Sequence, residues 1–187
     1  MPRTFDAVVV GAGYIGCAIA AELAAAGLRT ALLDCGGVAA GASRANYGNV
    51  QIQDAELAHS LPLVTSGAAV FKNLPDEQAA GIGYRPLGSL LLIETESQWQ
   101  LMAARLPALH AAGIPAELVS ARRLPELEPL LDSSNVLGAC YHPHEAQIYP
   151  FALLHATLRR ARAHGLSLHL HTKVTNFQVT GGRVSGV

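Results

Sequence analysis

Three glycines near the N-terminus have the spacing of a phosphate-binding turn. The hexapeptide GAGYIG places Gly11, Gly13 and Gly16 directly after an apolar run, which matches G-x-G-x-x-G. In such a turn the first glycine allows the tight bend, the second lets the backbone approach a pyrophosphate, and the third lets the helix pack closely on the sheet. The helix N-terminus then offers N–H groups and a positive dipole end to phosphate. The motif therefore predicts a dinucleotide site.

An acidic residue follows at the distance that such a site requires. Asp34 lies roughly 20 residues after the motif, where a carboxylate accepts both ribose hydroxyls of the adenosine half. A carboxylate there disfavours a 2′-phosphate, so NADP is disfavoured. The glycines and the acid together leave NAD and FAD as alternatives.

The flanking sequence supplies the elements that hold this turn. Residues 5–10 form a β-branched apolar run that suits a strand buried on both faces. Helical spacing follows, with an apolar stripe formed by Ile15, Ile19 and Leu23. Gly27 is placed to end this helix, and residues 29–33 read as a second strand.

The same apolar stretch has two other interpretations, a membrane span and a secretion signal. A span needs roughly 20 uninterrupted apolar residues, but the motif glycines and Glu22 interrupt this one. A signal peptide starts with basic residues, and here Arg3 is soon followed by Asp6. We therefore favour the strand–turn–helix and keep the secretion signal as a minority alternative.

Composition narrows the class of protein. The chain has 187 residues, half of them hydrophobic, a net charge of -1 and only 14% charged residues. Without a basic stripe, nucleic acid is not an expected partner. The three cysteines, Cys17, Cys35 and Cys140, are odd in number and widely spaced, which favours a reducing compartment. We expect a cytoplasmic protein without a transmembrane span, and leave open a peripheral association with the inner membrane.

The segment after Asp34 separates the two cofactors. Residues 35–54, CGGVAAGASRANYGNVQIQD, are rich in small residues and show no helix or strand period before Asn49. An NAD-binding domain would continue here with another strand and helix. A loop of small residues lets backbone N–H groups approach a ligand closely, and Ser43 and Arg44 can bond phosphate. This pattern favours FAD.

From here the sequence resembles a known family, the D-amino-acid oxidase superfamily of FAD-dependent amine oxidoreductases. The stretch from Gly11 to Gly27 is similar to its ADP-binding fingerprint, and GASRANYGNV to its second FAD-contacting segment. PLGSLLLIETE resembles its first substrate-domain strand, SARRLPELEPLL a short helix of that domain, and HEAQIYPFALLHATLRRARAHGLSLHLHTKV the return to the flavin domain. The resemblance covers nearly the whole chain.

The resemblance implies FAD contacts at particular positions. The pyrophosphate would lie against Gly11, Gly13, Tyr14, Ile15, Gly16, Ala42, Ser43 and Arg44. The adenosine would be held by Asp34, Cys35 and Val174. The flavin would be lined, through backbone groups, by Tyr47, Gly48 and Asn49. Glutamate is commoner than aspartate at the ribose position of this family, so the shorter Asp34 implies a longer hydrogen bond.

The implied fold class is α/β: a Rossmann-like FAD-binding domain, with a parallel sheet, helices and a β-hairpin layer, plus part of a smaller α+β substrate domain. We expect the first part of the FAD-binding domain at 1–80, the first part of the substrate domain at 81–145, and a return to the FAD-binding domain at 146–187. The chain stops at Val187 inside a predicted hairpin, and family members are about twice as long. We therefore expect the remainder of both domains to be missing.

Local patterns predict the remaining elements. A helix capped by Ser60 is expected at 61–73. A second should run from a Ser97–Gln100 capping box to Ala112, with a kink or break at Pro107. A third should run from Pro150 to Gly165, with Phe151, Leu154 and Leu158 facing inward. Strands are expected at 89–94 and 168–171, a hairpin at 174–187 around Gly181 and Gly182, and a loop with the domain crossing at 75–83.

Two further groups of residues could carry chemistry. His142, His144 and Glu145 could be metal ligands, but Pro143 extends the backbone and no other ligand cluster is apparent, so no metal is expected. Cys17 stands at a helix N-terminus, which would lower its pKa. We favour a buried, small apolar role for it.

The function that the resemblance implies is oxidation of the C–N bond of a small amino acid or secondary amine. Hydride would pass from the α-carbon to flavin N5, and water would hydrolyse the imine. No catalytic residue can be named among these 187 positions. An NAD-dependent dehydrogenase and a non-catalytic flavin-binding subunit are the alternatives. The electron acceptor is open, so an electron-acceptor subunit and a homo-oligomer are both candidate partners.

Overall fold

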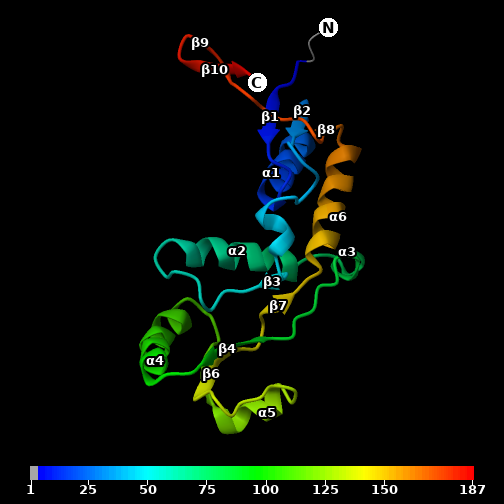
Figure 1. Cartoon of the computed structure of the whole chain (residues 1–187). Helices are drawn as coiled ribbons and strands as arrows, with labels where there is room; N and C mark the ends of the chain where they lie inside the picture. The colour runs from blue at the N-terminus through cyan, green and yellow to red at the C-terminus, as the bar shows by residue number, and fades with distance from the viewer. Residues whose placement is uncertain (1–3) are drawn as a thin grey trace. The chain divides into compact units, whose positions relative to one another are not determined.

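The computed structural model describes residues 4–187, which form two compact units (Figure 1). One unit contains the chain up to Tyr47 together with Pro150–Val187, and the other contains Gly48–Tyr149. The domain limits expected from the sequence, at residues 80 and 145, remain predictions. Arg3, which entered the argument about a secretion signal, lies outside the described residues. None of the helices within residues 4–187 is long and apolar enough to cross a membrane.

A three-stranded parallel sheet forms the centre of the first unit. Its strands are β1 (Ala7–Val10), β2 (Thr30–Leu33) and β8 (Ser167–His169), in the order β1-β2-β8. The strand that joins β2 on its other side thus comes from late in the chain. An NAD-binding domain would have placed a strand soon after Asp34, so this topology favours the FAD interpretation.

Two helices, α1 (Tyr14–Ala25) and α6 (Pro150–Ala163), share a core with this sheet. The buried residues of α1 are small: Cys17, Ala20, Ala21 and Ala24. Leu154, Leu158 and Ala161 of α6 and Leu32 of β2 complete the core. Small side chains allow the close approach of helix to sheet that the third motif glycine also serves.

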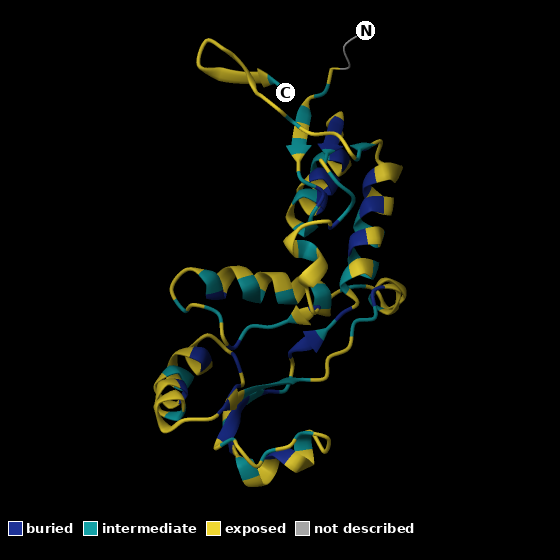
Figure 2. Cartoon of the chain, viewed as in Figure 1, coloured by how far each residue is buried: buried dark blue, intermediate teal, exposed yellow. Residues whose placement is uncertain are grey.

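The apolar stripe expected on α1 is not its buried face. Ile15 and Ile19 are 76% and 48% exposed, because the alanine face of the helix packs inward instead. Phe151, expected to face inward from α6, is also exposed. Residues 5–10 were expected to be buried on both faces, but Val8 and Val10 are exposed while Val9 packs on the core. Figure 2 shows strand β1 in the colours of intermediate and exposed residues.

The predicted hairpin at the end of the chain is confirmed. Strands β9 (Gln178–Thr180) and β10 (Arg183–Gly186) pair antiparallel. Gly181 and Gly182 connect them with φ angles of +59° and +76°, which glycine adopts without strain. The first strand begins later than the predicted residue 174.

The second unit combines a separate antiparallel sheet with helices. Strands β4 (Ser89–Ile93), β5 (Glu117–Ser120) and β6 (Gly138–His142) are ordered β4-β6-β5, and β3 (Asn49–Val50) pairs with β7 (Ala146–Gln147). Its helices are α2 (Ser60–Lys72), α3 (Asp76–Gly81), α4 (Glu96–Ala111) and α5 (Leu124–Leu127). Helix α4 packs on the sheet through Met102 and Leu109, in a core with Ile93 and Cys140. Residues 4–187 also contain two 3₁₀ turns, η1 (Ala42–Ala45) and η2 (Ala121–Arg123).

The start of α4 differs from the prediction. Its capping box is formed by Thr95 and Gln98, not by Ser97 and Gln100. The Thr95 hydroxyl accepts from the Gln98 N–H at 3.3 Å, and the Gln98 side chain accepts from the Thr95 N–H at 3.0 Å. The helix is not split at Pro107.

Two other local predictions were also wrong. Ser60 does not cap α2, because it is the first helical residue and the Glu56 carboxylate accepts the N–H groups of Ala58, His59 and Ser60. The segment 75–83, expected to be a loop, contains α3, since Asp76 and Glu77 place acidic residues in its first turn.

Candidate functional site

The motif glycines are required by the geometry of the turn. Gly11 has a φ of +106°, in the region that favours glycine, and its N–H donates to the Leu33 carbonyl at 2.7 Å. A Cβ added to Gly16 would lie 1.8 Å from the Gly11 carbonyl oxygen, and one added to Gly13 would lie 2.7 Å from the Ser43 hydroxyl. The turn therefore has no room for a side chain at Gly16, whereas a side chain at Gly13 would require the Ser43 hydroxyl to move.

The N-terminus of α1 has the chemistry of an anion site. Its N-cap residue, Gly13, contributes no side-chain cap, and its first turn contains no acidic residue. The Ser43 hydroxyl, carried on η1, accepts from the Tyr14 N–H at 3.2 Å. The loop between β2 and η1 is held near the turn because the Ala39 N–H donates to the Ala12 carbonyl at 2.9 Å. Donors without a countercharge at a helix N-terminus suit phosphate.

Asp34 holds the turn and the following loop together. Its carboxylate accepts from the Ala12 N–H and from the Gly36 N–H, each at 2.7 Å. Its own backbone carbonyl accepts from the Thr172 N–H at 2.8 Å, which brings the segment after β8 alongside. Val174 is half-buried and lies two residues beyond Thr172. The sequence predicted only the ribose contact of Asp34; its role within the protein is a finding of the structure.

The structure thus gathers Gly11, Gly13, Tyr14, Gly16, Asp34 and Ser43 by direct contacts. Apart from the half-buried Val174, the side chains of the other predicted residues of the first unit are open to solvent: Ile15, Cys35, Ala42, Arg44 and Tyr47. Gly48, which is buried, and Asn49, which is exposed, belong to the second unit.

Cys17 is buried beneath this turn, as favoured from the sequence. Burial raises the pKa of its thiol to about 11, and the charge of Asp34 adds to the effect. Burial thus outweighs the helix N-terminus, and the reactive thiol with a lowered pKa, which was disfavoured from the sequence, is not what the structure shows.

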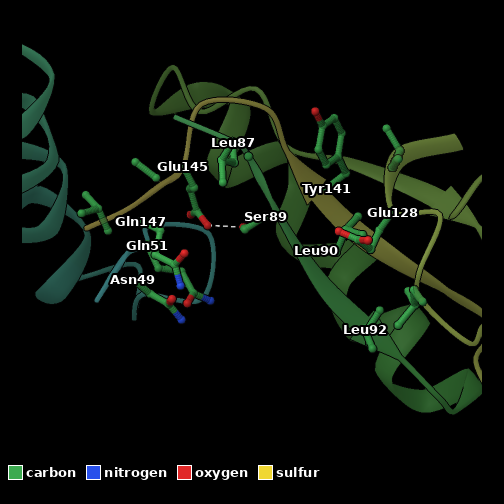
Figure 3. Close-up of a pocket in the computed structure, with 15 residues that line it drawn as sticks. Asn49, Gln51, Leu87, Ser89, Leu90, Leu92, Glu128, Tyr141, Glu145 and Gln147 are labelled. Carbon is green, nitrogen blue, oxygen red and sulfur yellow. Dashed lines mark hydrogen bonds between the residues drawn. The ribbon is translucent and has the colours of Figure 1, made fainter. Parts of the chain in front are cut away.

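A cavity of about 420 Å³ lies within the second unit (Figure 3). Polar side chains contribute one part of its lining: Asn49, Gln51, Ser89, Glu128, Tyr141, Glu145 and Gln147. Apolar side chains contribute the rest: Val50, Leu87, Leu90, Leu92, Leu127, Leu131 and Ala146. This size and mixed lining are typical of small-molecule sites. Apart from Asn49, the sequence did not predict these residues, because they come from five separate segments.

Glu145, weighed above only as a metal ligand, is the most buried carboxylate at the cavity, with 2% of its surface exposed. It accepts hydrogen bonds from the N–H groups of Ile52 and Gln53 and from the Ser89 hydroxyl. Neighbouring His142 is also buried, and burial lowers its pKa against the opposing charge of Glu145. Residues 4–187 contain no group of three or more His, Cys, Asp or Glu residues arranged to hold a metal ion.

Comparison with curated proteins finds relatives of several kinds. The chain is 29% identical over 181 residues to glycine oxidase from Geobacillus kaustophilus, covering 93% of this chain and 48% of that protein. It is 28% identical to anaerobic glycerol-3-phosphate dehydrogenase subunit A1 from Haloferax volcanii, covering 100% and 31%. It is 26% identical to the mitochondrial pyruvate dehydrogenase phosphatase regulatory subunit of Mus musculus, covering 100% and 21%. The chain therefore spans half or less of the length of these relatives.

Solved structures share the fold. L-proline dehydrogenase from P. horikoshii superposes with a TM-score of 0.87 at 23% identity, over 98% of this chain and 48% of that one. Glycine oxidase from Geobacillus kaustophilus superposes with a TM-score of 0.83 at 28% identity, over 93% and 48%. These matches confirm the Rossmann-like α/β fold. The family described as FAD dependent oxidoreductase (DAO) matches residues 6–187. The glycine turn, the parallel sheet and this match over nearly the whole chain show that the chain belongs to the DAO family of FAD-dependent oxidoreductases.

Proposed function

We propose that this chain is the FAD-binding and cavity-forming part of an oxidoreductase that oxidises the C–N bond of a small amino acid or secondary amine. The observation that carries the choice of an amine is the charge of the cavity. Its lining includes the carboxylates of Glu128 and Glu145, and none of the described lining residues is lysine or arginine. An acidic lining suits an amine nitrogen, which is cationic when protonated.

The residues of the first unit fit the FAD of the family. The first turn of α1 offers N–H donors with no acidic side chain, as a pyrophosphate requires. Because Gly13 has no side chain, a pyrophosphate could approach the backbone of the turn closely. The Asp34 carboxylate, already bound to two backbone N–H groups, would hold the ribose hydroxyls through its remaining acceptor capacity. Cys35, Ala42, Arg44, Tyr47 and Val174 remain proposed contacts, as do Gly48 and Asn49 of the second unit.

The chain's own residues would bind and orient the substrate. Bound FAD would supply a hydride acceptor at N5, and the oxidised product, an imine, would be hydrolysed by water. Glu128 would hold the amine end of the substrate, and the amides of Asn49, Gln51 and Gln147, which lie apart from Glu128 in Figure 3, would bind its other polar groups. The apolar side chains of the lining would exclude water and receive a small aliphatic substituent. None of the described lining residues is a lysine or arginine that could bind the substrate carboxylate.

A glycerol phosphate is the substrate named for another set of relatives. Phosphate recognition relies on arginine, lysine or a helix N-terminus. Arg85 donates to the Gln147 side chain at 2.9 Å but is not itself part of the lining. The charge of the cavity therefore supports an amine over a phosphate ester.

The test is anaerobic reduction of the complete flavoprotein. Adding glycine, sarcosine, proline and D-alanine in turn should bleach the flavin absorption with at least one of them, and glycerol 3-phosphate should not. Bleaching by glycerol 3-phosphate alone would overturn the amine assignment. Repeating the titration with Glu128→Gln, which should raise the amine concentration needed for half-reduction by about tenfold, would connect the reaction with this cavity.

A second candidate, a flavin-binding subunit without catalysis, is supported by one observation. A relative that aligns with the whole chain is named a regulatory subunit. This candidate predicts bound flavin that neither amines nor glycerol 3-phosphate reduce. A cytoplasmic location, an electron-acceptor subunit and a homo-oligomer remain proposals beside the proposed function.

A further inference from the structure

Residues 49–53, which run along the cavity, are held by the buried carboxylate of Glu145. Glu145 accepts from the backbone N–H groups of Ile52 and Gln53, the latter at 2.7 Å, and from the Ser89 hydroxyl. Figure 3 shows Glu145 and Ser89 joined across the cavity wall. The Gln53 side chain, itself fully buried, donates to the same Ser89 hydroxyl at 2.7 Å. Four residues from three segments thus share one hydrogen-bonded network.

The backbone needs this carboxylate because the neighbouring strand pair is short. Strand β3 pairs with β7 only at Asn49↔Gln147 and Val50↔Ala146. Beyond this pair, the N–H groups of Ile52 and Gln53 donate to the Glu145 side chain rather than to a strand. Buried N–H groups require such partners, so Glu145 extends the ladder by means of a side chain.

The guanidinium of Arg105 holds the same segment through its backbone carbonyls. Arg105 of α4 donates to the carbonyl of Gln53, with its Nε at 3.0 Å, and to the carbonyl of Ala55. The backbone of Gln53 therefore has its N–H bonded to a carboxylate and its C=O bonded to a guanidinium. Hydrogen bonds to charged groups are about twice as strong as neutral ones. This arrangement fixes the segment more firmly than neutral contacts would.

We propose that Glu145 and Arg105 are positioning residues, which fix the 49–53 segment so that Asn49 and Gln51 keep their places in the cavity wall. This inference rests on the proposed function, in which that cavity receives the amine. Glu145 does not act directly as a base, because it is almost fully buried and three donors already bond its two oxygens. Arg105 is not part of the lining, so it can affect a bound substrate only through the segment.

The decisive variant is Arg105→Lys in the complete holoenzyme, which keeps the charge but loses the fork that reaches two carbonyls. We expect the KM for the reducing amine to rise roughly five- to tenfold, which corresponds to about 1–1.4 kcal/mol of lost binding, with kcat changed less than twofold. Glu145→Gln should act in the same direction, because its amide still accepts from the backbone but presents N–H to the Ser89 oxygen. If Glu145→Gln does not fold, Arg105→Lys still tests the proposal.

Glu56→Gln is the matched control. Glu56 also accepts several backbone N–H groups in the same unit, but it is exposed and does not line the cavity. It should lower thermal stability slightly and leave KM unchanged. Gln51→Ala completes a double-mutant cycle with Arg105→Lys. If the effect travels through the segment, the two changes in KM should be non-additive.

Amide hydrogen exchange separates the outcomes. Faster exchange at Ile52 and Gln53 in Arg105→Lys, but not in Glu56→Gln, together with the raised KM, supports the inference. An unchanged KM in Arg105→Lys, in a protein whose flavin the amine does reduce, overturns the positioning role and leaves the proposed function intact. If no amine reduces the wild-type flavin, the proposed function fails and the positioning role falls with it.

Discussion

At the scale of single residues, Gly13 and Gly16 differ in what an added side chain would meet. A side chain at Gly16 would collide with the Gly11 carbonyl, which is backbone and cannot move aside, whereas one at Gly13 would meet the Ser43 hydroxyl, which can rotate. In this protein the two glycines can therefore be ranked by the steric cost of adding a side chain. Gly16 is the position where substitution should be least tolerated.

We predict that Gly16→Ala will destabilise the protein by about 1–3 kcal/mol, the usual cost of overpacking, and will reduce the flavin-to-protein absorbance ratio. The control is Gly67→Ala in the interior of α2, where an added Cβ meets nothing within 4 Å. That substitution should stabilise by about 0.4–1 kcal/mol. Chemical denaturation measures the change in the free energy of unfolding of each variant. Equal destabilisation by the two substitutions would contradict the steric explanation.

The ion pair of Asp6 and Arg29 makes stability depend on pH in the acid range. The Arg29 side chain and its backbone N–H lower the pKa of Asp6 from 3.8 to about 2. A carboxyl group with a lower pKa in the folded state contributes its stability above the unfolded pKa, and loses it as the pH falls from about 4 through about 2.

We therefore expect the wild-type melting temperature to fall more steeply between pH 4 and pH 2 than that of Asp6→Asn. Arg29→Gln removes the partner and should flatten the same part of the curve. The measurement is a thermal melt at closely spaced pH values. Parallel curves for the wild type and Asp6→Asn would show that this pair does not contribute.

At the scale of elements, the start of α4 shows how a local pattern can be shifted by two residues. Both Thr95–Gln98 and Ser97–Gln100 fit the capping-box pattern. The structure uses the first pair, with Thr95 in extended backbone and Glu96 as the first helical residue. The end of β4 at Ile93 leaves only Glu94 and Thr95 to turn into the helix, which decides between the two pairs.

Thr95→Ala should consequently cost about 0.5–2 kcal/mol of stability, the range measured for lost N-caps. Ser97→Ala, which removes the alternative cap, should change stability by less than about 0.5 kcal/mol. Urea denaturation of the two variants gives both values. A larger loss from Ser97→Ala would favour the pair predicted from the sequence.

At the scale of the whole molecule, the predicted FAD contacts are divided unequally between the two units. The turn, Asp34 and Ser43 all belong to the first unit, whereas the cavity belongs entirely to the second. We expect FAD added to the apoprotein to slow amide exchange at residues 11–16, 34–36 and 42–45. FAD at about 100 times its Kd adds roughly 2.7 kcal/mol to the free energy of unfolding. Amides that exchange only through global unfolding should then exchange about a hundredfold more slowly.

The β4-β6-β5 sheet serves as the internal reference in this experiment. If the units unfold independently, exchange in its strands should change far less than exchange in the glycine turn. Protection confined to the sheet would contradict the assignment of the cofactor to the first unit. Exchange measured by mass spectrometry at peptide resolution is sufficient, because the two sets of residues lie in separate peptides.

Features encoded within one short segment were predicted correctly. The glycine turn with its strand and helix, the final hairpin around Gly181 and Gly182, and the helix from Pro150 all depend on neighbours in the sequence. The FAD-dependent family followed from the order of such segments and is confirmed by the family match. These predictions succeeded because dihedral preference and hydrophobic period act over a few residues.

Tertiary structure alone decided which faces are buried and which distant residues meet. Ile15 and Ile19 matched the helical period, yet the alanine face of α1 packs against the sheet, because close packing favours small side chains over larger apolar ones. The network of Glu145, Ser89, Gln53 and Arg105 joins four positions spread over more than 90 residues of sequence, so no local pattern could reveal it. The sequence by itself determined the turn, the cofactor class and the family. The fold determined the cavity and the charged groups that hold its wall, since these exist only where separate segments are brought into contact.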